Sequence, residues 1–490
     1  MAEDVGASDA ALLSPLTEDS FLHNLHVRYK RDIIYTYAGN AVVCVNPCIP
    51  LPLYSAEAAR AYVRLGGTGL PPHIYGAAAV ALRRARSGRA AALLLTGDSG
   101  AGKTEAARVC LQLVLLAVPA PLAPTPAPLA AAGTLLEAFG NAATARNHNA
   151  SRFGKLLDIE FDFRGVPVSG NISICKYHLT VPIINKSRVC SVPTGERNFH
   201  VLYQLLAGAD AHLLKRLKLQ RSWEQYRILR GGGDGDGDGD ASGEGDGGAG
   251  GSAAQEEPLG GESPRRRAPG TPPPGPRPAA ADTEHFRHTL AAMRALDLDP
   301  EPVLRVLAFV LKLGNVQLQP QLNVDGSLGV RLQRRRELSE ACALVGVDEA
   351  ALAAALGAPA SPQGESAEAT AEMEVEGEAE VEAAAEAEAA AGAAWGAARR
   401  DRAAAAVYGR LFAWLVQAVN ARLGAGAGGG GGGGAAPLSI LDVYGLEALA
   451  TNTLERLVIN YAAERVQAAV STALRREQEE YVREGLPWRP

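Results

Sequence analysis

A glycine-rich stretch constrains the fold of this chain more than any other feature of its sequence. Residues 97–104 read Gly-Asp-Ser-Gly-Ala-Gly-Lys-Thr and fit the pattern G-x-x-x-x-G-K-[ST]. The apolar run Ala91–Thr96 before them predicts a short buried strand, and Lys103–Leu116 has the pattern of a helix. Glycines at such a turn let backbone N–H groups surround a phosphate, while Lys103 supplies counter-charge and the Thr104 hydroxyl can bind Mg²⁺. The sequence therefore predicts a site for nucleotide phosphates.

Two further motifs follow in an informative order. Asn147–Lys155 reads Asn-His-Asn-Ala-Ser-Arg-Phe-Gly-Lys, and Leu441–Glu447 reads Leu-Asp-Val-Tyr-Gly-Leu-Glu. The second of these stands at the end of an expected strand, and a strand that ends in aspartate suits a contact behind a bound Mg²⁺. The Asp-x-x-Gly pattern is common by itself, so its weight comes from its place after the other two motifs.

The three motifs together resemble those of a myosin motor (head) domain. Residues 97–104 resemble its P-loop, G-E-S-G-A-G-K-T, with Asp98 in place of glutamate. Residues 147–155 resemble switch I, N-x-N-S-S-R-F-G-K, and residues 442–447 resemble switch II, D-I-x-G-F-E. Kinesin motors share this arrangement, but their switch I reads S-S-R-S-H and differs from Phe153-Gly154-Lys155. The resemblance spans residues 21–230, 282–345 and 401–488, and matches far from the phosphate motif disfavour an unrelated P-loop NTPase.

The resemblance implies an α/β fold of the P-loop NTPase type. We expect a myosin-motor-like mixed central sheet flanked by helices, incomplete, and interrupted by long disordered insertions. The expected organisation, in chain order, is a disordered arm (1–20), a nucleotide-binding core with P-loop and switch I (21–230), a disordered Gly/Asp/Pro-rich insertion (231–281), a helical region like the upper 50-kDa subdomain (282–359), an acidic Glu/Ala segment (360–398), a helix (399–423), a Gly-rich linker (424–436), and the switch II strand with a relay-like helix (437–490).

Local patterns predict individual elements within this plan. Ile33–Tyr37 and Ala41–Val45 read as a hairpin, and Leu156–Phe163 and Cys175–Ile184 read as two strands. Helical patterns cover 282–320 and 335–357, and 453–483 reads as one long helix after a strand at 438–443. The Glu/Ala run at 361–398 fits either a solvated helix or a disordered acidic loop.

The resemblance also implies roles for individual residues. Ser99 and Lys103 would contact the γ-phosphate region, Asn147 would reach the phosphates, and the Gly445 N–H would sense the γ-phosphate. Arg152 and Glu447 would form the salt bridge that closes the site. The implied Mg²⁺ ligands are Thr104 and Ser151, with Asp442 behind a water. The implied ATP-binding set comprises the adenine-segment residues Asn46 and Tyr54 and the loop residues Gly97, Asp98, Ser99, Gly100, Ala101, Gly102, Lys103, Thr104 and Glu105.

Some positions depart from the family pattern and leave two functions open. Ala150 replaces a switch I serine whose hydroxyl would help to relay a proton, and Leu446 replaces the switch II phenylalanine. The resemblance ends with the relay-like helix, so the chain as given would lack the converter and neck. The first hypothesis is an actin-based Mg-ATPase motor in its full-length form, and the alternative is a non-motile nucleotide-binding remnant.

Composition and residue patterns indicate the cellular compartment in which we expect the protein. No run of about twenty apolar residues exists that would span a membrane, and the acidic start lacks the apolar region of a secretory signal. The 6 cysteines without paired C-x-x-C spacing read as free thiols in a reducing compartment. We therefore expect a cytoplasmic protein of the actin cytoskeleton, with filamentous actin as partner by resemblance, no nucleic acid, and no light chains on this stretch.

Overall fold

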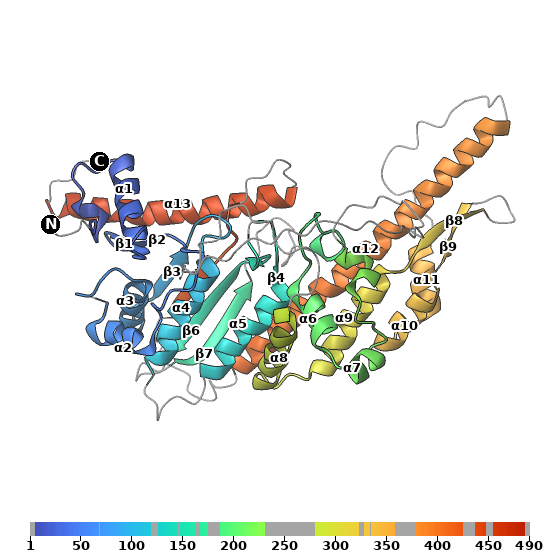
Figure 1. Ribbon diagram of the computed structural model, residues 1–490, viewed down its shortest axis with the longest axis horizontal. Coiled ribbons are helices and arrows are strands. Elements are labelled where there is room, and N and C mark those ends of the chain that lie inside the picture. Colours follow the sequence, from blue (N-terminus) through green and yellow to red (C-terminus); the bar gives the residue numbers. More distant parts are fainter. Residues whose placement is uncertain are drawn as a thin grey trace, which may run out of the picture.

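The structure of the 490-residue chain is a computed structural model (Figure 1). It describes residues 5–67, 69–118, 126–145, 147–161, 167–174, 187–230, 280–322, 328–333, 335–357, 378–424, 437–446 and 454–485. The predicted insertion at 231–281 therefore lies outside the described residues as far as position 279. So do residues 358–359 of the helical region, 360–377 of the acidic segment and 425–436 of the linker.

A four-stranded mixed sheet lies at the centre of the half of the molecule that contains the glycine-rich loop. Its strands stand in the order β3 (Ala91–Leu95), β10 (Leu438–Asp442), β6 (Lys155–Phe161) and β7 (Pro167–Ile174). β10 runs parallel to β3 and antiparallel to β6, and β6 runs antiparallel to β7. The expectation of a mixed sheet among helices is confirmed.

The interior position of β10 explains its sequence. Leu438, Ile440 and Asp442 are buried, whereas the two residues between them are half-buried. This alternation fits a strand with one face against the core and the other only partly covered. The strand predicted at Ala91–Thr96 is confirmed as β3, but its predicted burial was wrong. β3 occupies the edge of the described sheet, its residues are half-buried or exposed, and Leu94 is 39% exposed.

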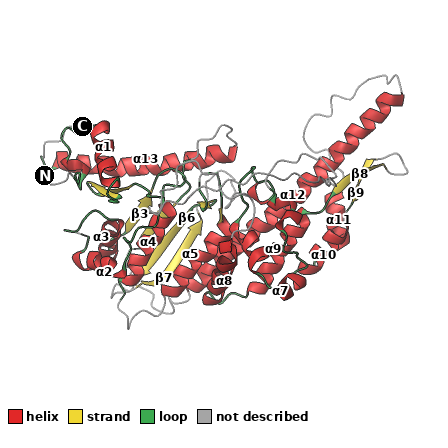
Figure 2. Ribbon diagram, viewed as in Figure 1, coloured by secondary structure: helices red, strands yellow, loops and turns green. Residues whose placement is uncertain are grey.

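Helices cover the two ends of this sheet (Figures 1 and 2). α3 (Ile74–Arg86) and α4 (Lys103–Leu116) pack together and against β3, with α2 (Ala56–Leu65) beside both. α12 (Glu378–Gly424) packs against β7 and α5 (Pro126–Gly140). The Asn420 amide accepts a hydrogen bond from the Ile172 N–H at 2.8 Å and donates one to the Ile172 carbonyl at 2.9 Å. This side chain thereby ties α12 to the edge strand.

A second group of helices forms the other half of the molecule. It comprises α6 (His200–Gly208), α7 (Ala211–Arg216), α8 (Ala280–Ala295), α9 (Pro300–Gly314), α10 (Arg335–Val345) and α11 (Glu349–Gly357). The helical prediction at 335–357 is confirmed, and that at 282–320 is confirmed as far as Gly314. Its last residues were predicted wrongly, because a hairpin that the sequence analysis missed begins at Leu318. β8 (Leu318–Leu322) contains a proline, which weakens a strand signal, and pairs with β9 (Leu328–Leu332).

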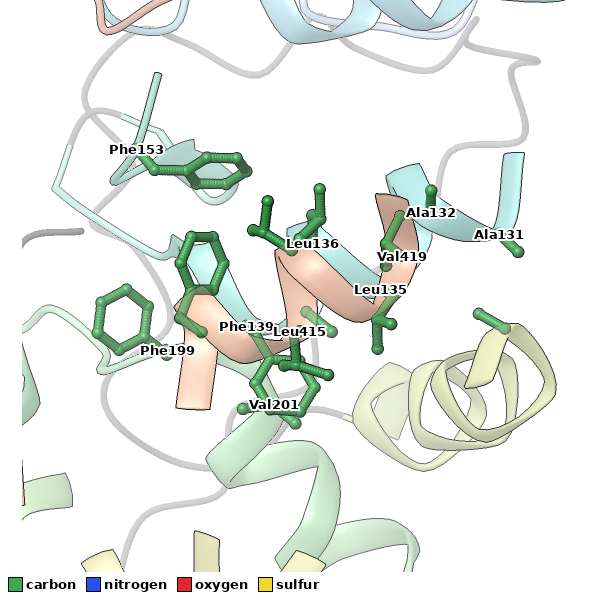
Figure 3. Close-up of a cluster of buried hydrophobic side chains, with 14 of the residues drawn as sticks. Ala131, Ala132, Leu135, Leu136, Phe139, Phe153, Phe199, Val201, Leu415 and Val419 are labelled. Carbon is green, nitrogen blue, oxygen red and sulfur yellow. The ribbon is translucent and has the colours of Figure 1, made fainter. Parts of the chain in front are cut away.

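The buried core joins the two halves where α5, α6 and α12 meet (Figure 3). Phe139 on α5, Leu415 on α12 and Val201 on α6 are fully buried there. Phe153 belongs to the predicted switch I motif, and its ring lies 5.1 Å from that of Phe412 on α12. The core therefore fixes the position of the functional motif as well as the helices.

The N-terminal segment was predicted wrongly. Residues 5–20 do not form a disordered arm: they contain the short helix η1 (Ala10–Leu12) and the start of α1 (Glu18–Tyr29). The Ala7 N–H donates to the Asn24 amide oxygen at 2.7 Å, and the Ser8 carbonyl accepts from the Tyr37 N–H at 2.9 Å. Backbone pairing with the hairpin of β1 (Tyr35–Ala38) and β2 (Ala41–Cys44) thus holds a stretch in which Val5, Leu12 and Leu16 are exposed.

The remaining element predictions hold with shifted bounds. The partner of β6 is β7 (Pro167–Ile174), which the sequence analysis did not predict, and the strand expected at Cys175–Ile184 lies outside the described residues. α12 begins at Glu378, so the expected helix at 399–423 is longer and includes part of the acidic run. The hairpin, the strand at 438–443 and the long helix α13 (Leu454–Arg483) are confirmed. None of the described helices is both long and apolar enough to cross a membrane.

The contact between α5 and switch I predicts the effect of adding one methyl group. A Cβ at Gly140 would lie 2.3 Å from Phe153 Cδ1 and 3.2 Å from Phe412 Cε2. We expect Gly140→Ala to lower the free energy of unfolding by about 1–3 kcal/mol, the usual cost of overpacking. Urea unfolding of the variant measures this.

The matched control lies on the same helix. A Cβ at Gly133 would meet nothing within 4 Å, so Gly133→Ala should raise stability by up to about 1 kcal/mol through helix propensity alone. Equal unfolding midpoints for Gly140→Ala and the unmodified chain would contradict the packing argument.

Candidate functional site

The predicted phosphate loop joins β3 to α4. Gly97, Gly100 and Gly102 have φ of +139°, +86° and +96°, which side chains other than glycine rarely adopt. Gly102 is the N-cap residue of α4, and no side chain caps the helix there. The first N–H groups of α4 thus remain available to an anion, and the helix dipole favours negative charge at the same place.

Lys103 places its charge over the loop that precedes it. Its Nζ donates hydrogen bonds to the carbonyl oxygens of Gly97 at 2.8 Å and Asp98 at 2.7 Å. The ammonium group therefore stands beside the N–H groups of the loop, where a phosphate oxygen would need a counter-charge.

The three predicted metal-site residues lie together, although they come from separate elements. Thr104 Oγ1 lies 3.1 Å from Ser151 Oγ and donates to Asp442 Oδ1 at 3.3 Å. Two hydroxyls and a carboxylate are hard oxygen donors, and Mg²⁺ binds few protein ligands besides water and phosphate. The donor set therefore fits Mg²⁺. No cluster of three or more His, Cys, Asp or Glu side chains that could hold a metal occurs among the described residues.

Asp442 is held from behind by a cation. Its carboxylate is only 3% exposed and forms an ion pair with Lys155 Nζ at 3.5 Å. Glu137 lies in the same region, and its burial raises the pKa of its carboxyl group, although Lys155 and Arg108 oppose this shift. Lys155 thus compensates the negative charge that collects around Asp442.

The predicted switch II loop contacts the phosphate loop through backbone atoms. The Leu446 carbonyl accepts a hydrogen bond from the Ser99 N–H at 3.2 Å. A Cβ on Gly445 would lie 2.2 Å from Ser99 N and 2.5 Å from the Asp98 carbonyl carbon. Only glycine therefore allows this approach, which gives a physical reason for the glycine of the motif.

The predicted switch I loop is held by polar contacts of its own. Asn147 accepts through its backbone oxygen from Thr144 N–H at 2.8 Å, and its side chain accepts from Asn149 N–H at 2.9 Å. Arg152 is 3% exposed, and its backbone N–H donates to the Gly140 carbonyl at 2.8 Å. Glu447 lies outside the described residues, so its pairing with Arg152 remains a prediction.

The predicted adenine segment reaches the phosphate loop through one of its two residues. Asn46 Nδ2 donates to the Gly100 carbonyl at 2.7 Å. Tyr54 is half-buried like Asn46, and its hydroxyl is 2.8 Å from that of Tyr35. The structure therefore brings Asn46, but not Tyr54, to the phosphate loop.

Most of the predicted site residues line one cavity. It is lined by Asn46, Ser99, Gly100, Gly102, Lys103, Thr104, Glu105, Asn147, Ser151 and Gly445. Among the other predicted residues, Asp442, Ala101, Tyr54 and Arg152 do not line the cavity. Asp442 accepts a hydrogen bond from Thr104, which does line it. Gly97 and Asp98 line a separate cavity next to α13, and residues of switch II also line that cavity.

The cavity also contains residues that the sequence analysis missed, namely Arg108, Glu137, Asn149, Val443 and Tyr444. Arg108 pairs with Glu105 through two hydrogen bonds of 2.9 and 2.5 Å. Their spacing of three residues on α4 is a detectable signal, because such residues are neighbours on a helix surface. Glu137 offers a weaker signal, a carboxylate among apolar residues of α5.

Comparison with known proteins shows which families and proteins this chain is similar to. The family model described as Myosin head (motor domain) matches residues 7–490. Human unconventional myosin-Ib is 35% identical over 488 residues, which are 99% of this chain and 37% of that protein. Mouse unconventional myosin-Ia is 35% identical over 491 residues, which are 99% of this chain and 40% of that protein. The chain thus spans about two fifths of the length of these relatives.

The contact between Gly445 and Ser99 generates a direct prediction. Gly445→Ala should push the switch II loop off the phosphate loop and break the hydrogen bond from Ser99 N–H to Leu446. We expect amide hydrogen exchange in residues 96–102 to accelerate about five- to tenfold, which corresponds to the loss of one hydrogen bond. Gly424→Ala is the control, because a Cβ there would meet nothing within 4 Å. Unaltered exchange in Gly445→Ala would refute the contact.

Proposed function

Because the chain belongs to the myosin head (motor domain) family, we propose that its cavity binds and hydrolyses Mg·ATP in an actin-based motor. The observation that carries this proposal is the convergence of three distant motifs on one cavity. Lys103 and Thr104 come from the P-loop, Ser151 from switch I and Gly445 from switch II. Each supplies a group that phosphoryl transfer requires.

The phosphate loop would bind the β- and γ-phosphates. Its backbone N–H groups and the α4 dipole favour negative charge, and Lys103 neutralises phosphate oxygens. Phosphoryl transfer depends mainly on positioning and charge stabilisation, so these fixed groups would supply much of the transition-state stabilisation.

Thr104 and Ser151 would hold Mg²⁺, with Asp442 acting through a water. When bound, the ion supplies charge neutralisation between the β- and γ-phosphates. The chain contributes the orientation of these groups: the ion pair of Lys155 with Asp442 holds the carboxylate toward Thr104. Hydrogen bonds of this kind behind a metal ligand keep it in one orientation.

The remaining groups would act at the γ-phosphate. Ser99, Gly445 and Asn147 line the cavity and come from three different motifs. We propose that Arg152 and Glu447 close the site and exclude bulk water, as the family pattern implies. Exclusion of water strengthens each electrostatic contact inside the site.

A second candidate, a module that binds nucleotide without turnover, is favoured by Ala150. This residue is 1% exposed and pairs across β4 (Asn141–Ala142) and β5 (Ala150–Ser151) with Ala142, so the chain has a methyl group where the family pattern has a hydroxyl. Loss of that proton route would slow hydrolysis more than binding.

Actin is the partner that we propose for the full-length protein, with the cytoplasmic actin cytoskeleton as its location. The support is family membership and the similarity to unconventional myosins. Co-sedimentation of this chain with filamentous actin, with and without Mg·ATP, tests the proposal. Release of the chain from filaments by Mg·ATP supports it, and the same pelleting with and without actin contradicts it.

Nucleotide binding should depend on Lys103. We expect Lys103→Ala to weaken binding of a fluorescent ATP analogue in Mg²⁺ by a factor of at least about 100, because charge-assisted hydrogen bonds contribute about 1.5–3 kcal/mol each. Lys215→Ala, which removes an exposed lysine on α7, should leave binding unchanged. Equal affinity in Lys103→Ala and the unmodified chain would sink the assignment of the phosphate site.

Turnover should respond to restoration of the hydroxyl at position 150. We expect Ala150→Ser to raise steady-state phosphate release by several-fold over the unmodified chain, since proton transfer by a positioned group accelerates reactions. Ala142→Ser is the control, because it buries the same hydroxyl on the paired strand, where Ala142 is 0% exposed. Equal phosphate release in all three proteins would show that position 150 does not limit the rate.

A further inference from the structure

A basic cavity lies between α2 and α3, apart from the candidate nucleotide cavity. The two helices pack together (Figure 1), and the cavity between them has a volume of about 250 Å³. That volume suits a small molecule, since pockets for drug-sized ligands are usually about 300–1,000 Å³. Three arginines and several apolar residues line it, among them Arg64, Arg83, Arg86, Val63, Leu65 and Leu82. None of these six residues lines the candidate nucleotide cavity.

Positive charge is concentrated in the segment that forms this cavity. Residues 56–89 contain six arginines, no lysine and one acidic residue, which gives the segment a formal net charge of +5. The acidic residue, Glu57, belongs to the first turn of α2, whereas Arg64 belongs to its last turn. The carboxylate therefore stands at the end of the helix away from the cavity.

The arginines of the cavity have no acidic partner within the part of the chain that the structure describes. Arg64 and Arg83 form no hydrogen bond or ion pair there. The Arg83 guanidinium lies near the end of α2, where a Cβ on Gly66 would be 2.9 Å from Arg83 Nη1. Arg86 Nη2 donates to the Ala117 carbonyl at 3.2 Å. Partial burial lowers the pKa of Arg86, and no described carboxylate opposes this shift. Three cations thus line one cavity without a counter-charge.

This arrangement of like charges opposes folding. Arg60 and Arg64 are four positions apart on α2. Arg83 and Arg86 are three positions apart on α3, and like charges at either spacing repel each other on a helix surface. The helix dipole favours cations in the last turn of each helix, but it does not require arginines of two helices to line the same cavity. An anion bound in the cavity would relieve the repulsion.

We propose that the cavity between α2 and α3 binds a small anion with two or more phosphate groups, either free in solution or as the headgroup of a lipid. Guanidinium groups bind phosphate oxygens through two parallel N–H donors, a geometry that a lysine lacks. Arg64 and Arg83 supply such donors from different helices, so one ligand can contact both. Val63 and Leu82 line the same cavity and suit the carbon skeleton between the phosphates. The site lies outside the nucleotide cavity and goes beyond the proposed function.

The test is titration calorimetry with inositol hexakisphosphate, which carries a phosphate on each carbon of a small ring. The chain carries Lys103→Ala, so that the phosphate loop lacks its main cation, and about 150 mM salt screens diffuse surface charge. We expect Arg83→Gln and Arg64→Gln each to weaken binding by at least about tenfold, the effect of one charge-assisted hydrogen bond. Arg84→Gln is the control, because it removes the same charge from the last turn of α3 but Arg84 does not line the cavity. It should change the affinity less than about twofold.

A second arm distinguishes the two sources of the ligand. Flotation measures retention of the same chains on phosphatidylcholine vesicles with and without phosphatidylinositol bisphosphate. Binding of the soluble probe alone, lost in Arg83→Gln, assigns a free anion, and retention that needs both the phosphorylated lipid and Arg83 assigns a lipid headgroup. Binding of neither probe would overturn the inference. Equal weakening by Arg83→Gln and Arg84→Gln would overturn it as well, because diffuse charge would then explain the binding.

Discussion

The parallel pairing of β3 with β10 is the constraint on which the rest of the site depends. It places Asp442 opposite Leu95, so that the end of β10 stands next to the start of the phosphate loop. Thr104 and Asp442 are 338 positions apart in the sequence, yet they share a hydrogen bond because of this pairing. Carboxyl ends of neighbouring parallel strands meet at one edge of a sheet, which is where ligands bind in open α/β folds. Switch II therefore passes close to the backbone of Ser99, and only glycine at position 445 allows this close approach.

Charge balance is the second requirement that the fold meets. Asp442 is buried, and an isolated buried carboxylate would be strongly destabilising without a cation close by. Lys155 supplies that cation from the neighbouring strand β6, and the antiparallel register of β6 and β10 sets Lys155 directly opposite Asp442. The last residue of switch I thus has a structural role that follows from strand register, in addition to its place in the motif. Phe153 anchors the same motif in the core through Phe412, so polar and apolar contacts fix it from two sides.

The sequence allowed prediction of those features that local chemistry determines. The strand, glycine loop and helix at 91–116 were predictable because the motif requires backbone geometry that few residues permit. The pairing of Pro167–Ile174 with β6 was not predicted, because the sequence pattern there does not reveal which residues pair with β6. The ordered segment 5–20 escaped prediction because hydrogen bonds to Asn24 and Tyr37 hold it while Leu12 and Leu16 stay exposed. Glu137 was missed because only the folded chain brings α5 to the cavity, whereas the spacing of Arg108 from Glu105 was a signal that the sequence analysis did not use.

The two ends of the cavity differ in how they are built, and this difference explains why one is easier to recognise in sequence. At the proposed phosphate end, the glycine pattern supplies backbone N–H groups, a helix terminus and one lysine, so a single motif reveals much of this end. At the proposed base end, the groups are side chains with distant neighbours, such as Tyr54 behind the cavity lining, which contacts Tyr35 and His73. Cys48 and Ile49 differ from the family pattern in that segment, whereas the contact between Asn46 and Gly100 is formed all the same. A site of this second kind tolerates changes at exposed loop positions as long as the buried residues behind it stay in place, because those residues set its geometry.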